Sequence, residues 1–168
     1  MNLYNIHKVD NFNEHKNKLI NLINKIPETS IKEQKQKISH TDWQIPKTMK
    51  REYLEYFFKK IFKNFAKNIC HKFDAQSIEV INMWFQIYKK GDFHNLHRHP
   101  NAHFTNVFFV NLPNKNLKTQ IYSLEKNIID VSIEEGDILS FPGFLKHESL
   151  INTYEEEKII ISFNINLI

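Results

Sequence analysis

Four of the nine histidines fall between residues 94 and 103, in and just after the segment from Gly91 to Pro100. Two of the four, His97 and His99, are two residues apart. In an extended segment, imidazoles at this spacing point to the same face, as two ligands of one metal ion must. The pair alone is a weak signal, because surface histidines between two strands are common enough to produce it.

His147 is the best candidate for a third ligand. It lies 48 residues beyond His99, shortly after the turn Phe141-Pro142-Gly143. If the chain folds as a β-barrel, strands that are far apart in the sequence can face each other across the open end of the barrel. Three histidines on one face would leave about three positions open on an octahedral metal ion, which is the arrangement of non-haem Fe(II) oxygenases.

Lys158 is the basic residue that completes this set. It begins the last expected strand, where it shares a face with Ile160, Ser162 and Asn164. A cation inside a barrel is costly without an anionic partner. A dicarboxylate cosubstrate would provide that partner, with its remote carboxylate bound by Lys158 and by a hydroxyl group of Ser162 or Tyr88. The alternative is an exposed lysine that follows the acidic turn at 155–157.

Four nearby polar residues allow less specific interpretations. His94 could bind substrate or support the ligands, and a surface loop histidine is an equal alternative. For His103 a role outside the ligand set is favoured. Asp92 and Asp137 could orient a ligand imidazole, but both lie in turn sequences, which favours a capping role.

The second half of the chain is expected to form the strands that hold these residues. From residue 77 the apolar pattern has a period of two. Ile78, Val80, Asn82, Trp84, Gln86 and Tyr88 are predicted on one face, and Met83, Phe85 and Ile87 on the other. Further strands are predicted at 103–112, 118–123, 128–133, 138–141, 145–150 and 158–167. Short strands with frequent turn signals are typical of a sandwich or barrel, so we expect a jelly roll.

The first half is expected to supply one or two helices outside this jelly roll. Helices are predicted at 11–26, ended by Pro27, and at 49–73, with Thr48 as the N-cap. The second helix carries a wide apolar stripe, which we expect to face the core, although it could form a homodimer face. Its lysines are expected to be solvated rather than to bind nucleic acid. The polar residues 28–46 predict a loop.

Length and composition limit the class of protein. With 168 residues, 41% apolar and 25% charged, the chain is expected to form a single domain, 1–168. Within it, residues 1–75 would pack on a barrel core of residues 77–168. The single cysteine, Cys70, excludes an intrachain disulfide framework and favours a reducing, cytoplasmic location.

Charge and hydropathy argue against binding to nucleic acid and against insertion into a membrane. A net charge of +4 is too mild to indicate nucleic acid. No apolar run approaches the ~20 residues of a membrane span, and the N-terminus lacks the order of a signal peptide.

Several stretches together resemble a known family. They are Trp84 to Asp92, His97-Arg98-His99-Pro100, Phe104 to Phe109, Glu135 to His147, and Lys158 to Asn164. Across about residues 80–166 the chain is similar to the 2-oxoglutarate/Fe(II)-dependent oxygenases, specifically to a small branch found in bacteria and phages. The block Gly136-Asp137…Phe141-Pro142…His147 is the most specific part of the resemblance.

The resemblance implies a double-stranded β-helix in which His97, His99 and His147 hold Fe(II) and Lys158 anchors 2-oxoglutarate. It implies a dioxygenase that couples oxidative decarboxylation of 2-oxoglutarate by dioxygen to hydroxylation of a substrate. The chain departs from most of the superfamily at His99, where Asp or Glu is usual. Many relatives also have Arg at the position of Lys158. A guanidinium group can bind a carboxylate through two parallel hydrogen bonds, whereas the lysine ammonium is a single point charge.

Two other functions remain open at the level of sequence. A three-histidine set also resembles the thiol dioxygenases of the cupin superfamily, which do not use 2-oxoglutarate. The chain departs from the cupin motifs at His103, Val110 and Phe144. The second alternative is a jelly-roll binding protein whose histidines are incidental. The substrate is open between a small molecule and a side chain of a macromolecule.

Overall fold

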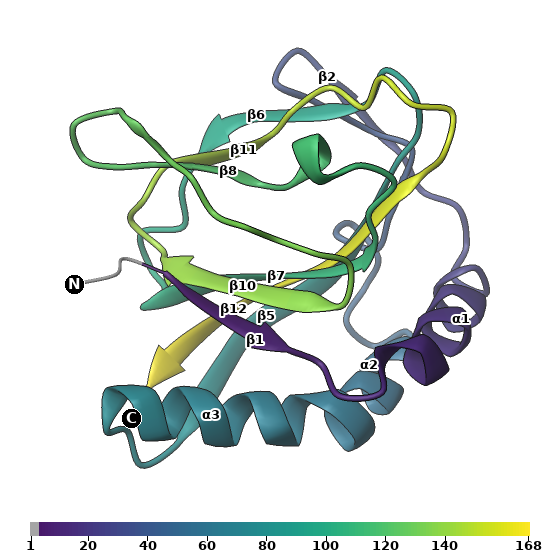
Figure 1. Ribbon diagram of the computed structural model, residues 1–168. Coiled ribbons are helices and arrows are strands. Elements are labelled where there is room, and N and C mark those ends of the chain that lie inside the picture. The colour runs from purple at the N-terminus through teal and green to yellow at the C-terminus, as the bar shows by residue number, and fades with distance from the viewer. Residues whose placement is uncertain (1–3) are drawn as a thin grey trace.

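The computed structural model describes residues 4–168, which form two antiparallel six-stranded sheets that lie over each other (Figure 1). The major sheet has the order β1 (Asn5–Lys8), β10 (Asp137–Pro142), β7 (Phe104–Asn111), β12 (Lys158–Leu167), β5 (Ile78–Tyr88) and β4 (His40–Thr41). The minor sheet has the order β2 (Ile31–Glu33), β3 (Gln36–Ile38), β6 (Phe93–His97), β11 (His147–Ser149), β8 (Gln120–Tyr122) and β9 (Ile128–Ile129). A 3-10 turn, η2 (Lys115–Leu117), precedes β8. This architecture confirms the predicted jelly roll.

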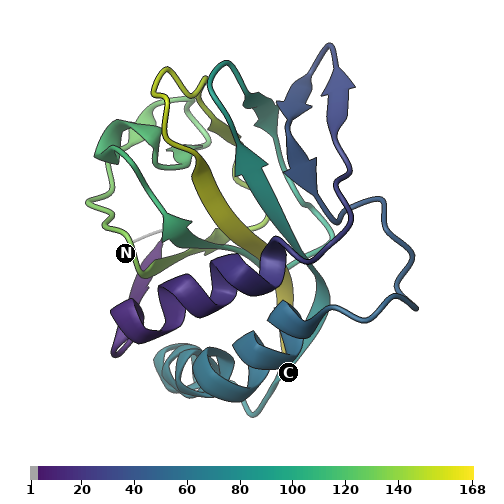
Figure 2. The same ribbon diagram turned by 90° about the vertical axis from the view of Figure 1, so that its right-hand side faces the viewer.

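Helices cover the outer face of the major sheet (Figures 1 and 2). They are α1 (Phe12–Ile23), α2 (Glu52–Phe57), the π-helical turn η1 (Phe58–Phe62) and α3 (Lys63–Phe73). The last three form one continuous helical segment, as the sequence predicted for 49–73. None of the described helices is long and apolar enough to cross a bilayer.

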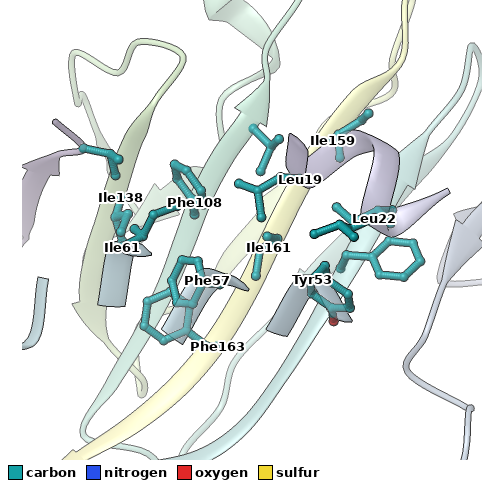
Figure 3. Packing of buried hydrophobic residues seen from close by; sticks show 14 of the residues in the cluster. Leu19, Leu22, Tyr53, Phe57, Ile61, Phe108, Ile138, Ile159, Ile161 and Phe163 are labelled. Atoms are coloured by element: carbon teal, nitrogen blue, oxygen red, sulfur yellow. The ribbon is translucent and has the colours of Figure 1, made fainter. Parts of the chain in front are cut away.

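The apolar stripe of this helical segment packs on the major sheet. Tyr53, Phe57, Ile61, Phe65 and Ile69 are all buried there, against side chains that include Phe108, Ile161 and Phe163 (Figure 3). The ring centroids of Phe57 and Phe163 lie 5.5 Å apart. Burying each such side chain contributes roughly 1.5–3 kcal/mol. The stripe is therefore a core surface, as predicted.

A second core lies between the two sheets, and strand alternation separates it from the first. On β12, Ile159, Ile161 and Phe163 face the helices. Ile160 belongs to the inner core, and Lys158 and Ser162 lie on the same side of the strand. Successive side chains of a strand point to opposite faces, so the face predicted for Lys158 is confirmed as an inner one.

The prediction of a loop at 28–46 is wrong. This segment forms the hairpin β2–β3, in which Ile31 pairs with Ile38, and the short strand β4, which pairs with β5. The hairpin extends the minor sheet, since Gln36 pairs with His94 of β6. Ile31 and Ile38 are buried in the inner core. The strands form because β5 and β6 offer them partners, which the local polar sequence does not show.

Two finer predictions are also corrected. The helix begins at Glu52 and its N-cap is Arg51, not Thr48; the Arg51 guanidinium instead donates to the Ile45 carbonyl at 2.7 Å. On β5 the pairing with β12 shifts register at Ile81, so that Asn82 pairs with Asn164 but Val80 with Ile165. This bulge turns Ile78 and Val80 to the helix side, while Trp84, Gln86 and Tyr88 face inward.

Candidate metal centre

The structure brings His97, His99 and His147 together. His97 ends β6 and is the direct antiparallel partner of His147 on β11. Their ring centroids lie 4.2 Å apart, and the His99 ring lies 5.1 Å from His97 and 5.3 Å from His147. One potential ligand atom from each lies within 4.8 Å of the others. Within residues 4–168 this is the one group of three side chains that could share a metal ion.

His99 lies beyond the end of β6 and is held by the turn before His147. Its backbone N–H donates to the Gly143 carbonyl at 2.8 Å, and its own carbonyl accepts from the N–H of Ala102 at 3.1 Å. A Cβ atom on Gly143 would lie against the Ala102 carbonyl oxygen and 2.5 Å from that of His99. Only glycine permits this close approach, so the Phe141-Pro142-Gly143 turn positions His99.

The protonation of the three rings suits a metal ligand set. Burial lowers the pKa of His97, brings that of His99 to about 4 and holds that of His147 well below its usual value. The rings are therefore neutral at pH 7, as metal ligation requires.

Two of the rings also have a defined orientation. Nδ1 of His97 lies 2.7 Å from the Asn95 carbonyl, and Nδ1 of His147 lies 3.3 Å from that of Leu145. A carbonyl only accepts, so each Nδ1 carries the proton and Nε2 remains free to bind. A set of neutral imidazoles suits iron, zinc, nickel and copper. The residues thus fit a metal ion, and their role as ligands stays a prediction.

His94 joins this group more closely than the sequence indicated. Its ring stacks on that of His97 with centroids 3.8 Å apart and an angle of 12°. Burial, with the neighbouring His97, His99 and Lys158, lowers the pKa of His94 to about 3. His94 is therefore a neutral ring against the back of a candidate ligand, and not a loop histidine on the surface.

His103 and the two aspartates lie outside the cluster. His103 is exposed, and its Nδ1 accepts from the Leu167 N–H at 3.0 Å, which agrees with the expected role outside the ligand set. The Asp92 carboxylate accepts from the backbone N–H groups of Ser39 and Lys89, both at 2.9 Å. Asp137 accepts from the N–H of Glu134 at 2.8 Å. Both aspartates therefore cap turns.

An inner cavity extends from the three histidines into the barrel. Tyr88, Ser149 and Ser162 line it, together with Val107 and Ile160. All five side chains are at least nine-tenths buried, so bulk water is largely excluded. The cavity has both apolar walls and hydroxyl groups.

Lys158 lies beside this cavity, buried to 1% exposure. Its Nζ donates to the Ser149 hydroxyl at 2.7 Å and lies 5.2 Å from the ring centroid of Tyr88. No carboxylate among residues 4–168 pairs with it, although eleven other ion pairs form there. Burial lowers the pKa of Lys158 to about 7. The exposed-lysine alternative is therefore wrong.

The hydroxyl groups around Lys158 differ from the predicted pair. Tyr88 lies beside Nζ as expected, and burial raises the pKa of its phenol. Ser162 lines the cavity but donates to Oε1 of Gln86 at 3.4 Å. The hydroxyl bound to Lys158 is that of Ser149, which sequence reasoning missed. The sequence feature that could have identified Ser149 is its position two residues after His147, on the same face of a strand.

No family profile and no curated protein matches this chain. Among solved structures it is similar to a viral collagen prolyl hydroxylase from Paramecium Bursaria Chlorella virus-1, at 17% identity and a TM-score of 0.62, with 98% of this chain and 96% of that one covered. It is also similar to a 2OG-Fe(II) oxygenase family oxidoreductase from Burkholderia pseudomallei, at 9% identity and a TM-score of 0.74, with 98% and 85% covered.

A third similar structure is the non-haem alpha-ketoglutarate-dependent epimerase SnoN from nogalamycin biosynthesis. The identity is 8% and the TM-score 0.75, with 98% of this chain and 77% of that one covered. At such low identity the likeness concerns the fold, and that fold is the one the sequence resemblance predicted. The chain therefore has the double-stranded β-helix fold of the 2-oxoglutarate/Fe(II)-dependent oxygenases.

Proposed function

We propose that this protein is an Fe(II)- and 2-oxoglutarate-dependent oxygenase. The observation that carries the proposal is Lys158, a buried lysine without a carboxylate partner beside the cavity that the three histidines close. A buried cation without a counter-ion is destabilising, which is explained if a ligand supplies the anion. 2-Oxoglutarate has a carboxylate for this lysine and, at its other end, two oxygens that can chelate a metal ion.

His97, His99 and His147 would hold the metal ion. Bound there with 2-oxoglutarate and dioxygen, Fe(II) would supply the oxidising chemistry. Three neutral rings leave the site one charge more positive than a set that includes a carboxylate, which favours an anionic cosubstrate. The stacked ring of His94 and the Nδ1–H bonds of His97 and His147 restrict how the ligand rings can turn.

Lys158, Ser149 and Tyr88 would bind the far carboxylate of 2-oxoglutarate. The Lys158 ammonium supplies the charge, and the two hydroxyl groups supply hydrogen bonds in a nearly dry cavity. Because the pKa of Lys158 is about 7 without a counter-ion, an arriving carboxylate would raise it. Above pH 7 the lysine would therefore take up a proton as the dianion binds.

The all-histidine set also favours a second candidate, a cupin-like metal dioxygenase that does not use 2-oxoglutarate. In that function Lys158 has no partner, which is why we place it second. Calorimetric titration of the metal-loaded protein with 2-oxoglutarate separates the two. Saturable binding supports the first candidate, and no binding by a protein that holds metal supports the second.

The central experiment combines metal content with turnover. The wild type, purified with Fe(II), is expected to bind iron and to form succinate from 2-oxoglutarate under air. His97→Ala and His147→Ala should lose the metal, whereas the matched variant His103→Ala should keep it. Equal iron content in all three variants would refute the ligand assignment. Wild-type protein that never retains metal would favour a jelly-roll binding protein.

A further inference from the structure

A second cavity adjoins the candidate metal centre on the side away from Lys158. Its walls include Trp43, Trp84, Gln36, Gln86, Ile31 and Ile38. It shares His94, His97 and His99 with the inner cavity. A group bound in it would therefore lie next to the metal ligands. Four of these six residues come from the hairpin β2–β3 and the segment after β4.

The walls of this second cavity carry no formal charge. No carboxylate, ammonium or guanidinium group is among the lining side chains. Two charged residues of the hairpin have partners outside the cavity or at its edge: the ammonium of Lys37 lies 3.3 Å from Asp92, and the exposed Glu33 accepts from Gln36 at 3.1 Å. A charged group would lose its hydration here, and no side chain of the walls would supply a counter-ion.

Trp43 offers an uncovered aromatic surface beside the buried Trp84. Their ring centroids lie 4.6 Å apart at an angle of 72°, an edge-to-face pair. Trp84 is buried and approaches His99 with centroids 5.9 Å apart, whereas Trp43 is 51% exposed. Aromatic rings of this size are usually covered, and a flat apolar group of a ligand would cover Trp43.

Gln86 supplies a single polar contact at the junction of the two cavities. Its side chain is 5% exposed and lines both. The Ser162 hydroxyl donates a hydrogen bond to Oε1 of the Gln86 amide at 3.4 Å. No other hydrogen bond to this amide forms within residues 4–168. In either orientation of the amide, one polar atom therefore remains for a ligand.

We propose that the second cavity binds the reacting part of the substrate as an uncharged, ring-sized group, packed flat on Trp43 and hydrogen-bonded to Gln86. Its role as the substrate cavity rests on the proposed function. Its preference for a neutral group rests on the walls alone. The cavity would select neutral cyclic substrates over phosphorylated, carboxylated or ammonium-bearing ones.

Intrinsic fluorescence tests this preference directly, because Trp43 and Trp84 are the only tryptophans in the chain. The probes are benzamide, benzoate and benzamidinium, which have nearly the same shape and differ in charge. Each is titrated into the full-length protein in EDTA, so that benzoate cannot bind through a metal ion. Benzamide should bind with a Kd about tenfold or more below those of the two charged probes, since neither finds a counter-ion.

Single-residue variants test whether benzamide binds in the second cavity. Trp43→Ala should weaken benzamide binding about fivefold, followed by the emission of Trp84, because an aromatic contact is lost. Gln86→Leu should weaken it by a similar factor of about five through the lost hydrogen bond. Phe144→Ala is the matched control, since Phe144 is a half-exposed aromatic residue that lines neither cavity. Trp43 is exposed, so its variant keeps the fold even if Gln86→Leu does not.

Three results would overturn the inference: equal or tighter binding of either charged probe, no binding of benzamide up to its solubility, or unchanged benzamide binding by Trp43→Ala. None of these measurements needs iron or 2-oxoglutarate. A protein that decarboxylates 2-oxoglutarate but fails the probe test would keep its proposed function and lose this substrate class. The reverse outcome would leave a neutral-ring site without the proposed chemistry.

Discussion

Replacing Lys158 by methionine should make the ligand-free protein more stable while it abolishes 2-oxoglutarate binding. Burial lowers the pKa of Lys158 from 10.5 to about 7, which corresponds to roughly 5 kcal/mol against the charged lysine in the folded state. Methionine has a similar shape and no charge. It also loses the hydrogen bond to Ser149 and the contact with the Tyr88 ring, worth together about 2–3 kcal/mol.

The net expectation is a gain of about 2 kcal/mol at pH 6, or roughly 4–8 °C in Tm for a chain of this size. The gain depends on pH in a defined direction. The folded pKa lies below the unfolded one, so between about pH 7 and 10.5 the unfolded wild type binds more protons. Wild-type stability therefore rises with pH over this window, and the advantage of the variant shrinks.

Thermal and urea unfolding of both proteins in EDTA at pH 6, 7, 8 and 9 measures this difference. Lys90→Met is the control, because Lys90 is an exposed lysine paired with Glu155 and its loss should change stability by less than about 1 kcal/mol. A Lys158→Met variant less stable than the wild type at pH 6 would refute the reasoning. So would a stability difference that does not narrow at higher pH.

Three further outcomes follow from the same geometry. Gly143→Ala should reduce the metal content at least about twofold by mass spectrometry, because its Cβ would displace the backbone at His99 and Ala102, and unchanged metal content would contradict that role. Phe163→Ala should lower the free energy of unfolding in urea by about 3–5 kcal/mol, because its ring is fully buried under the helices, yet leave metal content intact. Above pH 7 the affinity for 2-oxoglutarate should fall by up to about tenfold per pH unit, because binding then requires Lys158 to take up a proton. Calorimetry in buffers of different ionisation enthalpy should detect this proton uptake. An affinity that does not change between pH 6 and 9 would argue against Lys158 as the carboxylate partner.

The sequence by itself determined most of the strands after residue 77 and the stripe of the long helix. Residues 158–167 alternate so regularly that the residues sharing a face with Lys158 followed from the period alone. The alternation of β12 and the stripe of the helix are local patterns, each within one element, so they needed no knowledge of the partner strands. The spacing of His97 and His99 predicted that their rings would lie together, but His99 lies beyond the end of β6, where the Gly143 turn holds it. His147 was found because the turn before it is distinctive.

The tertiary structure alone decided which hydroxyl reaches Lys158, where His94 lies and what forms the second cavity. Ser149 and Lys158 meet because β11 and β12 face each other across the barrel, and His94 stacks on His97 through the local path of β6. The strands between residues 31 and 41 are two or three residues long. Such short strands carry too few residues to show a period, and they are stable only through hydrogen bonds to β5 and β6. Trp43 therefore reaches the metal side of the barrel by a path that only the assembled sheets define.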